Sequence, residues 1–519
     1  MAEFRTLEKN GDEAFIPDFW GGFFGGEDRR IGTNEDLTDV DLSRYDLSDL
    51  DLSGANFTGA IFENTRISNV NLERTNLTDV DLSNLKNGKV DEYGTFYMVE
   101  SGNIIGTPTL PAGYMMFNGY ILGKAVDLTN ADLTNADLSD FNLRFADLTG
   151  ATLTGVKTSI STKLPSRLPE GYHKIYEDFG IHEGYIVGPG VNLSGANLSN
   201  AGLAGVDLTG VDLSGANLSG TTLTGVTSGS ITGTPTLPAA YGMFNGYIVG
   251  PGVDLTNANL TGADLTGFDL TGTNLSDATL TDVVSGFITG SPTLPAAYGM
   301  YSGYIVGPGV DLTNANLRYA DFTGFDLSGA NLTGATLIGS TLTDVASGSI
   351  TGTPTLPAAY GMLSGYIVGP GVDLTNANLT DADLTGFDLT GVTLSGADLT
   401  SAYLVGVNLR STTLIGADLS RADLEGADLS GADLSSANLD AAYLTGADLT
   451  DTTLTNVYSY NITGTPMLPA DFIMYGGHIV GPGVNLHDAI LTRADLTGLD
   501  LTGTNLSDAT LTDVVSGFI

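Results

Sequence analysis

The chain repeats a five-residue pattern of apolar and polar positions over most of its length. Each unit reads as a small residue, Asp or Asn, Leu, Ser or Thr, and a variable residue, and residues 417–426 hold two consecutive copies. A period of five matches neither the 3.6-residue repeat of an α-helix nor the two-residue repeat of a strand. It is typical of a solenoid, in which each unit forms one side of a coil and the coils stack.

The central apolar residues of these units fall into seven blocks, which together hold 59 units and about 295 of the 519 residues. The blocks run over Leu37–Leu82, Leu128–Leu153, Leu193–Leu223, Leu255–Leu280, Leu312–Leu342, Leu374–Leu454 and Leu486–Leu511. A repeat array of this kind escapes the usual size limit of a single core, because each coil contacts only its neighbours. The pattern therefore predicts one continuous all-β region over residues 34–519 rather than several globular domains.

Six copies of a second element, here called cassettes, interrupt the units near residues 85–125, 156–190, 226–252, 283–309, 345–371 and 457–483. Each cassette places a turn dipeptide between two short apolar runs, and a type I′ turn of this kind needs positive φ at both central residues. The dipeptides are Asn118-Gly119, Glu183-Gly184, Asn245-Gly246, Ser302-Gly303, Ser364-Gly365 and Gly476-Gly477. We predict that each cassette forms a β-hairpin that packs on the solenoid.

Two further expectations concern how the cassettes fit the coils. The fourth unit after a cassette often begins with a large residue, which we expect to fill a wider cavity beside the hairpin, although duplicated sequence alone would also produce it. These residues are Phe141, Phe268, Phe325, Phe387 and Leu499. The spacing between successive blocks is 57 residues in one case and 62 in others, a difference of one five-residue side, so equivalent hairpins cannot all emerge on one face of the solenoid.

The two ends of the chain depart from the repeat. Residues 1–33 contain the only tryptophan, Trp20, within an aromatic stretch, and we expect them to form an N-terminal cap of the solenoid or a docking segment for another protein. The last residues, Leu501–Ile519, are identical to Leu270–Ile288, where the chain continues into another hairpin. We therefore expect a fragment of a longer protein, or an end that meets a partner.

The composition narrows the classes of partner. With 60 Asp and Glu against 19 Lys and Arg, the net charge is -41, which argues against binding nucleic-acid phosphates or anionic membranes. The chain has no cysteine, so disulfides and thiolate sites are excluded. The N-terminus is polar and shows no signal-peptide core, and no apolar run is long enough for a membrane helix. The compartment stays open, with an extracellular or cell-surface location favoured by analogy with repetitive bacterial surface proteins.

No residue pattern indicates catalysis. The four histidines are predicted to lie on the surface, because no nucleophile or metalloprotease spacing accompanies them. They are His173, His182, His478 and His487. Glycine-rich pieces such as Gly250-Pro251-Gly252 lack the Lys of a phosphate loop. We therefore assign no catalytic, cofactor-binding or metal-ligating residue and expect a protein that is not an enzyme.

The acidic residues of the repeat are the one collective feature that is relevant to ligand binding. Asp occupies 28 and Asn 16 of the 59 second positions, so the negative charge is built into the repeat. Stacked carboxylates about 5 Å apart repel one another, and divalent cations would relieve that repulsion. Weak calcium binding along this ladder is one interpretation, and a solvated ladder of alternating Asp and Asn is the other.

The units closely resemble the pentapeptide-repeat family, whose pattern is Ala, Asp or Asn, Leu and two variable residues. The resemblance implies a right-handed quadrilateral β-helix with four units per coil, in which the central Leu and the small residue two before it point inward. Asp and Asn in the second position are suited to hydrogen-bonding the backbone at the corners. The cassettes depart from the family pattern, and the resemblance says nothing about them.

Three classes of function fit these observations to different extents. The first is a non-enzymatic structural scaffold, a rigid acidic rod that serves as a spacer, fibre segment or surface component through protein partners or self-assembly. The second is a protein-binding DNA mimic of the topoisomerase-inhibitor type, which the resemblance implies and the net charge fits. The third is an ice-binding surface built from Thr arrays such as Thr256, Thr261 and Thr266, which the mixing with Ser disfavours. The oligomeric state is open.

Overall fold

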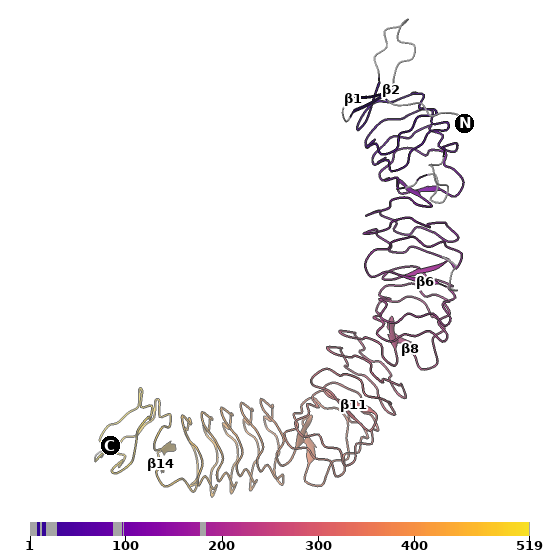
Figure 1. Cartoon of the computed structure of the whole chain (residues 1–519). Helices are drawn as coiled ribbons and strands as arrows, with labels where there is room; N and C mark the ends of the chain where they lie inside the picture. Colours follow the sequence, from indigo (N-terminus) through magenta and orange to yellow (C-terminus); the bar gives the residue numbers. More distant parts are fainter. Residues whose placement is uncertain are drawn as a thin grey trace. The chain divides into compact units, whose positions relative to one another are not determined.

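The computed structural model describes residues 8–10, 13–16, 29–86, 96, 98–176 and 183–517. The chain divides into two compact units, Met1–Leu255 with Leu270–Asn274 and Thr256–Asp269 with Leu275–Ile519. Each unit is a stack of coils made from the five-residue repeats (Figure 1). Among the described residues, no helix has the length and apolar character needed to cross a bilayer.

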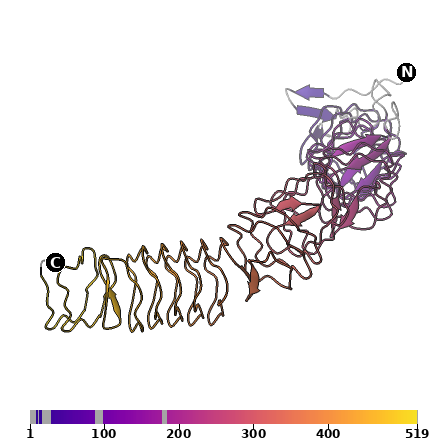
Figure 2. The same ribbon diagram turned by 90° about the horizontal axis from the view of Figure 1, so that it is seen from below.

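The coils contain four five-residue units each. In the second unit, parallel bridges join Asp373 to Thr393 and Thr393 to Thr413, twenty residues further on each time. Backbone hydrogen bonds fix this register, since the Leu394 N–H donates to the Thr413 carbonyl at 2.7 Å and the Thr413 N–H donates to the Val392 carbonyl at 3.0 Å. The expected right-handed quadrilateral β-helix is confirmed, and its evenly spaced coils are plain in the orange segment of Figure 2.

The core of each coil is made by two residues of every unit, as expected from the apolar positions. Ala422 and Leu424 are both 0% exposed, whereas Asp423 and Glu425 between and after them point away from the core. The fifth residue turns the corner in the left-handed region, with φ of 66° at Gly426. Gly, Asn, Asp and Ser are common at this position because they tolerate positive φ at low cost.

Five cassettes form two-stranded antiparallel hairpins with two-residue turns. The turns have positive φ at both central residues, for example 44° at Asn245 and 80° at Gly246, which confirms the predicted type of turn. The paired strands are β4 (Met115–Phe117) with β5 (Tyr120–Leu122), β8 (Gly242–Phe244) with β9 (Tyr247–Val249), β10 (Gly299–Tyr301) with β11 (Tyr304–Val306), β12 (Gly361–Leu363) with β13 (Tyr366–Val368), and β14 (Ile473–Tyr475) with β15 (His478–Val480).

The remaining cassette also forms a hairpin, but the predicted turn at Glu183-Gly184 is wrong. Strand β6 (His173–Tyr176) pairs with β7 (Gly184–Val187), and Tyr176 is the partner of Gly184. Each of these strands has four residues, so the ladder extends one pair further than in the other cassettes. The chain therefore reverses before Gly184, in a connection that lies mostly outside the described residues.

Each hairpin is attached to the coils by a small set of recurring contacts. The N–H of Ile367 in β13 donates to the Ser347 hydroxyl, twenty residues earlier, at 3.0 Å. The Tyr360 hydroxyl, just before β12, donates to the Pro370 carbonyl at 3.0 Å. A Cβ on Gly361 would lie 2.7 Å from the Phe387 ring, so this ring packs directly against β12. The expectation that a large residue packs beside the hairpin is confirmed here.

The same packing occurs in the preceding cassette of the second unit. A Cβ on Gly299 would lie 2.6 Å from the Phe325 ring. Phe141 in the first unit is partly buried and packs against the hydrophobic core. At Phe325 and Phe387 the large residue therefore has a packing role beyond sequence duplication, and for Phe268 and Leu499 this role stays a prediction.

The hairpins do not share one side of the coil, as the cassette spacing predicted. In the second unit, Asp311 follows β11 and lies on the side of the coil after hairpin β10–β11. Asp326 lies three sides further along the chain and is therefore back on the side of that hairpin. Asp326 bridges Ala346, and Ala346 bridges Asp373, the first bridged residue after β13. Hairpin β12–β13 therefore occupies the side before that of β10–β11.

Residues near the N-terminus form a three-stranded antiparallel sheet of β1 (Glu8–Asn10), β2 (Glu13–Ile16) and β3 (Arg29–Ile31). Ala14 and Ile31 are 2% and 3% exposed and belong to the same buried cluster as Leu37 of the first coil. Whether residues 1–33 act as a cap or as a docking segment stays a prediction, and Trp20 lies outside the described residues.

Candidate functional site

The candidate functional surface is the set of outward-facing side chains at the second position of each unit. One carboxylate oxygen of each Asp usually accepts a hydrogen bond from the N–H two residues later, as Asp383 does from Thr385 and Asp398 from Thr400, both at 3.0 Å. This is the corner interaction expected for Asp and Asn. These side chains therefore have two roles: they stabilise the backbone of the coil, and they present charge to solvent.

The same hydrogen bonds keep the ladder ionised. The hydroxyl and backbone N–H of Thr134 lower the pKa of Asp132 below its ordinary value, and Thr323 does the same for the pKa of Asp321. Hydrogen bonding to the charged form favours that form. Hydrogen bonds of this kind favour the charged form of these carboxylates, which suits them to cations and basic partners.

At one place on the first unit, the pKa of a carboxyl group is raised instead of lowered. A cavity of about 370 Å³ is lined by residues that include Glu73, Glu100 and Asp127. Burial raises the pKa of Glu100, and the charges of Asp127, Asp51 and Glu73 raise it further. Mutual repulsion therefore accumulates here, whereas elsewhere hydrogen bonds offset it. Calcium binding along the ladder stays a prediction.

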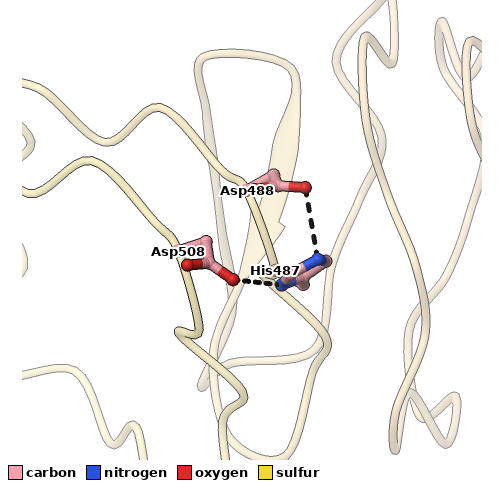
Figure 3. A group of neighbouring side chains, drawn as sticks. All are labelled: His487, Asp488 and Asp508. Atoms are coloured by element: carbon pink, nitrogen blue, oxygen red, sulfur yellow. Dashed lines mark ion pairs between the residues drawn. The ribbon is translucent and has the colours of Figure 1, made fainter.

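A second cluster lies on the last coils of the second unit (Figure 3). His487 sits between two carboxylates, with Nε2 3.2 Å from Asp488 Oδ2 and Nδ1 3.6 Å from Asp508 Oδ2. Nδ1 also lies 3.0 Å from the Ser507 carbonyl oxygen. Sequence reasoning missed this cluster, and the signal that would have found it is the twenty-residue spacing of Asp488 and Asp508.

The geometry of this cluster places the His487 ring between two carboxylates. The three side chains are exposed, and among the described residues they are the one group of three or more His, Cys, Asp or Glu close enough to hold an ion. The two ring nitrogens face different carboxylates (Figure 3), and one ligand atom from each of the three side chains lies within 4.8 Å of the other two. His487 Nε2 faces Asp488, while Nδ1 contacts the Ser507 carbonyl and lies near Asp508 in the next coil, so the ring links two successive coils.

The other histidines have different outcomes. His173 is exposed, as predicted. The surface prediction for His478 is wrong, because this residue is 3% exposed and its Nδ1 lies 2.6 Å from the Ser459 carbonyl oxygen. It occupies the first position of β15, where Tyr366 stands in β13, and this position packs against the coil. His182 lies outside the described residues.

The comparison with solved structures found several repeat proteins of the same kind. A pentapeptide repeat protein from the thylakoid lumen of Arabidopsis thaliana is 33% identical over 18% of this chain and 61% of its own length, with a TM-score of 0.15. The pentapeptide repeat protein Rfr23 from the cyanobacterium Cyanothece 51142 is 23% identical over 30% of this chain and 87% of its own, with a TM-score of 0.14. This chain thus spans less than two thirds of the Arabidopsis protein.

A trypsin-treated variant of QnrB1, described as a plasmid-mediated fluoroquinolone resistance protein, is 14% identical over 52% of this chain and 90% of its own, with a TM-score of 0.12. The comparison with curated proteins found no match.

Family membership rests on the comparison with family sequence profiles. The profile of Pentapeptide repeats matches more than half of the chain, and its matches fall on the blocks of five-residue units. The matched residues are 36–74, 46–84, 125–157, 190–226, 252–284, 309–345, 373–410, 393–431, 417–456 and 483–515. The cassettes lie largely between the matches, so the hairpins are an addition to the repeat. With four units per coil and the Leu and small residues buried, the chain belongs to the pentapeptide-repeat family.

Proposed function

We propose that this protein is a non-enzymatic structural scaffold, a rigid acidic β-solenoid that acts as a spacer, fibre segment or cell-surface component. The observation that carries the proposal is the unbroken ladder of the block over residues 373–456, in which every coil is hydrogen-bonded to the next. Such a stack resists bending and stretching because each coil is held on all four sides. The lack of a convergent catalytic constellation among the described residues is in keeping with this role.

The rigidity of the block is open to direct measurement because the chain has no cysteine. Spin labels on Thr375→Cys and Thr455→Cys would lie on one side of the solenoid, four coils apart, at about 19 Å. Pulsed electron–electron double resonance should give a narrow distribution of label-to-label distances that does not change with salt or calcium. A broad distribution, or one that shifts with ionic conditions, would contradict a rigid spacer.

Self-assembly is tested by sedimentation velocity of the full chain in millimolar calcium and, separately, in EDTA. A calcium-dependent increase to large assemblies would favour a fibre or surface role and would make the acidic ladder part of it. An unchanged sedimentation coefficient would leave a passive spacer and would remove calcium from the proposal.

The second candidate is a protein-binding DNA mimic, and the net charge of -41, carried largely by the regularly spaced Asp residues, is the observation that favours it. The hairpins lie on more than one side of the coil and interrupt the columns of carboxylates, which makes the surface less like a duplex. The test is a supercoiling assay of a purified bacterial type II topoisomerase in the presence of the chain. Inhibition at micromolar concentration or below would favour the mimic over the scaffold.

A further inference from the structure

One side of the uninterrupted block carries an alternating column of acidic and aromatic side chains. Parallel bridges join Asp383 to Tyr403, Tyr403 to Asp423 and Asp423 to Tyr443, so these four residues stand above one another in successive coils. The two tyrosines are 53% and 52% exposed. We refer to these four residues as the Tyr–Asp column.

The fold does not require tyrosine at these two positions. Among the 59 second positions, Tyr occurs only at 403 and 443, and both fall on the same side, two coils apart. A tyrosine side chain cannot accept the short-range hydrogen bond that Asp383 accepts from the N–H of Thr385. Thr463, which bridges Tyr443 in the next coil, shows that a small polar residue fits this column. The aromatic rings are thus exposed where smaller residues would complete the coil.

The tyrosines stand at a spacing that an extended peptide can match. Two coils separate them, which corresponds to about 9.6 Å along the solenoid axis. A polyproline II segment advances about 9.3 Å every three residues and returns each third side chain to the same direction. A segment lying along the axis would therefore place every third side chain over successive tyrosines.

The charge around the column is mainly negative. Asp383 and Asp423 alternate with the tyrosines, and the exposed residues Asp381 and Glu425 add further carboxylates. The cations in this stretch are Arg421 and Arg410, and Arg410 is paired with Asp428. Cations bind over tyrosine faces, and guanidinium groups also stack on them. A carboxylate in the coil between two rings adds an ionic partner for the same cation.

We propose that the Tyr–Asp column binds an extended basic segment of a partner protein, with Arg or Lys at every third residue. The proposal names a class of partner for the scaffold and rests on that function. The cationic side chains would lie over Tyr403 and Tyr443 and contact Asp383 and Asp423, while the peptide backbone follows the solenoid axis. Each additional coil with the same alternation would add one more contact point.

The probe for this proposal is a fluorescent peptide of four Arg-Pro-Pro repeats, with a control peptide of the same composition whose arginines are consecutive. Anisotropy at 150 mM salt should show tighter binding of the regularly spaced peptide to the full chain. The double variant Tyr403→Thr/Tyr443→Thr should weaken that binding by about tenfold or more, since two cation–π contacts are lost. Thr occupies the equivalent position at Thr463, so the variant should keep the circular dichroism spectrum of the parent.

A matched pair of single variants separates specific contact from general charge. Asp423→Thr and Asp433→Thr each remove one carboxylate, from opposite sides of the block, and only the first belongs to the column. Asp423→Thr should weaken peptide binding several-fold more than Asp433→Thr. Equal losses in the two variants would show that the peptide responds only to net charge and would overturn the proposal.

Two other outcomes would also overturn it: no measurable binding of the spaced peptide, or equal affinity for the spaced and consecutive peptides. These failures are distinct from failure of the scaffold function. If the spin-label distance between Thr375→Cys and Thr455→Cys stays narrow while the peptide does not bind, the rigid scaffold stands and the Tyr–Asp column is not its partner site.

Discussion

Two regions of the second unit close their coils in different ways. In the block over residues 373–456, each coil takes twenty residues, and the same five-residue unit closes every side. In the coil that carries β12 and β13, the chain needs 27 residues to pass from Ala346 to Asp373 on the same side. In the first region each side follows from the sequence of its own five-residue unit. The second region depends on contacts with distant residues such as Ser347 and Phe387.

The difference shows which parts of the sequence are most constrained by this fold. Within the block, a unit needs only a Leu, a small residue and a residue that tolerates positive φ, so many sequences satisfy each position. The β12–β13 cassette instead uses a serine twenty residues before Ile367, a glycine in its first strand and an aromatic ring in a later coil. The outward surface of the block is consequently free to vary, whereas that of the cassette is constrained by packing.

The largest predicted effect comes from breaking the core of the block. Leu424 is 0% exposed, and Leu424→Ala should lower the free energy of unfolding by about 2–5 kcal/mol, because it removes buried surface and leaves a cavity. Urea denaturation of the full chain measures this loss. Hydrogen exchange should speed up mainly in the coils next to Leu424 and not at β12–β13, because each coil contacts only its neighbours.

The control for this prediction is Glu425→Ala, which changes the next residue but on the outer surface. Its effect should stay within about 0.5 kcal/mol, as is usual for exposed positions. Similar losses for the two variants, or acceleration of exchange throughout the unit, would show that the block does not behave as a stack of independent neighbours.

An intermediate effect is expected from the cassette. Gly361→Ala would place a Cβ 2.7 Å from the Phe387 ring and should cost about 1–3 kcal/mol through overpacking. Adding Phe387→Ala should recover part of that cost, so the two substitutions should be coupled in a double-mutant cycle measured by urea denaturation. Gly202→Ala, at a glycine with open space around it, is the control and should be close to neutral. Strict additivity of the two substitutions would contradict the proposed contact.

The five-residue pattern was enough to predict the local part of this architecture. Burial of Ala422 and Leu424 follows from the spacing of apolar residues alone, and the turn at Asn245-Gly246 follows from the positive φ that such a turn needs. These features depend on neighbours in sequence. The number of units per coil came only from the resemblance to a known family, because nothing within one unit determines when the chain has made a full circuit.

Features that depend on contacts between coils were predicted less well. The burial of His478 was missed because its partner, the Ser459 carbonyl, is nineteen residues away. Aligning the cassettes would have helped, since His478 stands where other cassettes have a tyrosine. The turn at Glu183-Gly184 was misplaced because the register of β6 and β7 extends further than the dipeptide suggests. The Tyr–Asp column emerges only when the coil length is known.

The smallest predicted effect tests how the two regions respond to acid. The hydroxyl and backbone N–H of Thr400 lower the pKa of Asp398 in the block, and the Thr380 hydroxyl lowers it further. A lowered folded-state pKa contributes stability that is present above the unfolded pKa of about 4 and is lost as the pH falls through the folded value. The block should therefore loosen below about pH 4, and amide exchange there should increase relative to β12–β13.

Asp398→Asn isolates this contribution, because Asn378 and Asn438 hold the equivalent place on the same side and still accept the backbone N–H two residues later. At neutral pH the variant should be less stable by only a few tenths of a kcal/mol, since the carboxylate is largely exposed. The deficit should begin to shrink below about pH 4 and vanish below the lowered folded-state pKa, because protonation removes from the parent the contribution that the amide never had. Urea denaturation at pH 7 and pH 3 measures both values. A deficit at pH 3 as large as that at pH 7 would mean that Asp398 stabilises the coil through packing rather than through its charge.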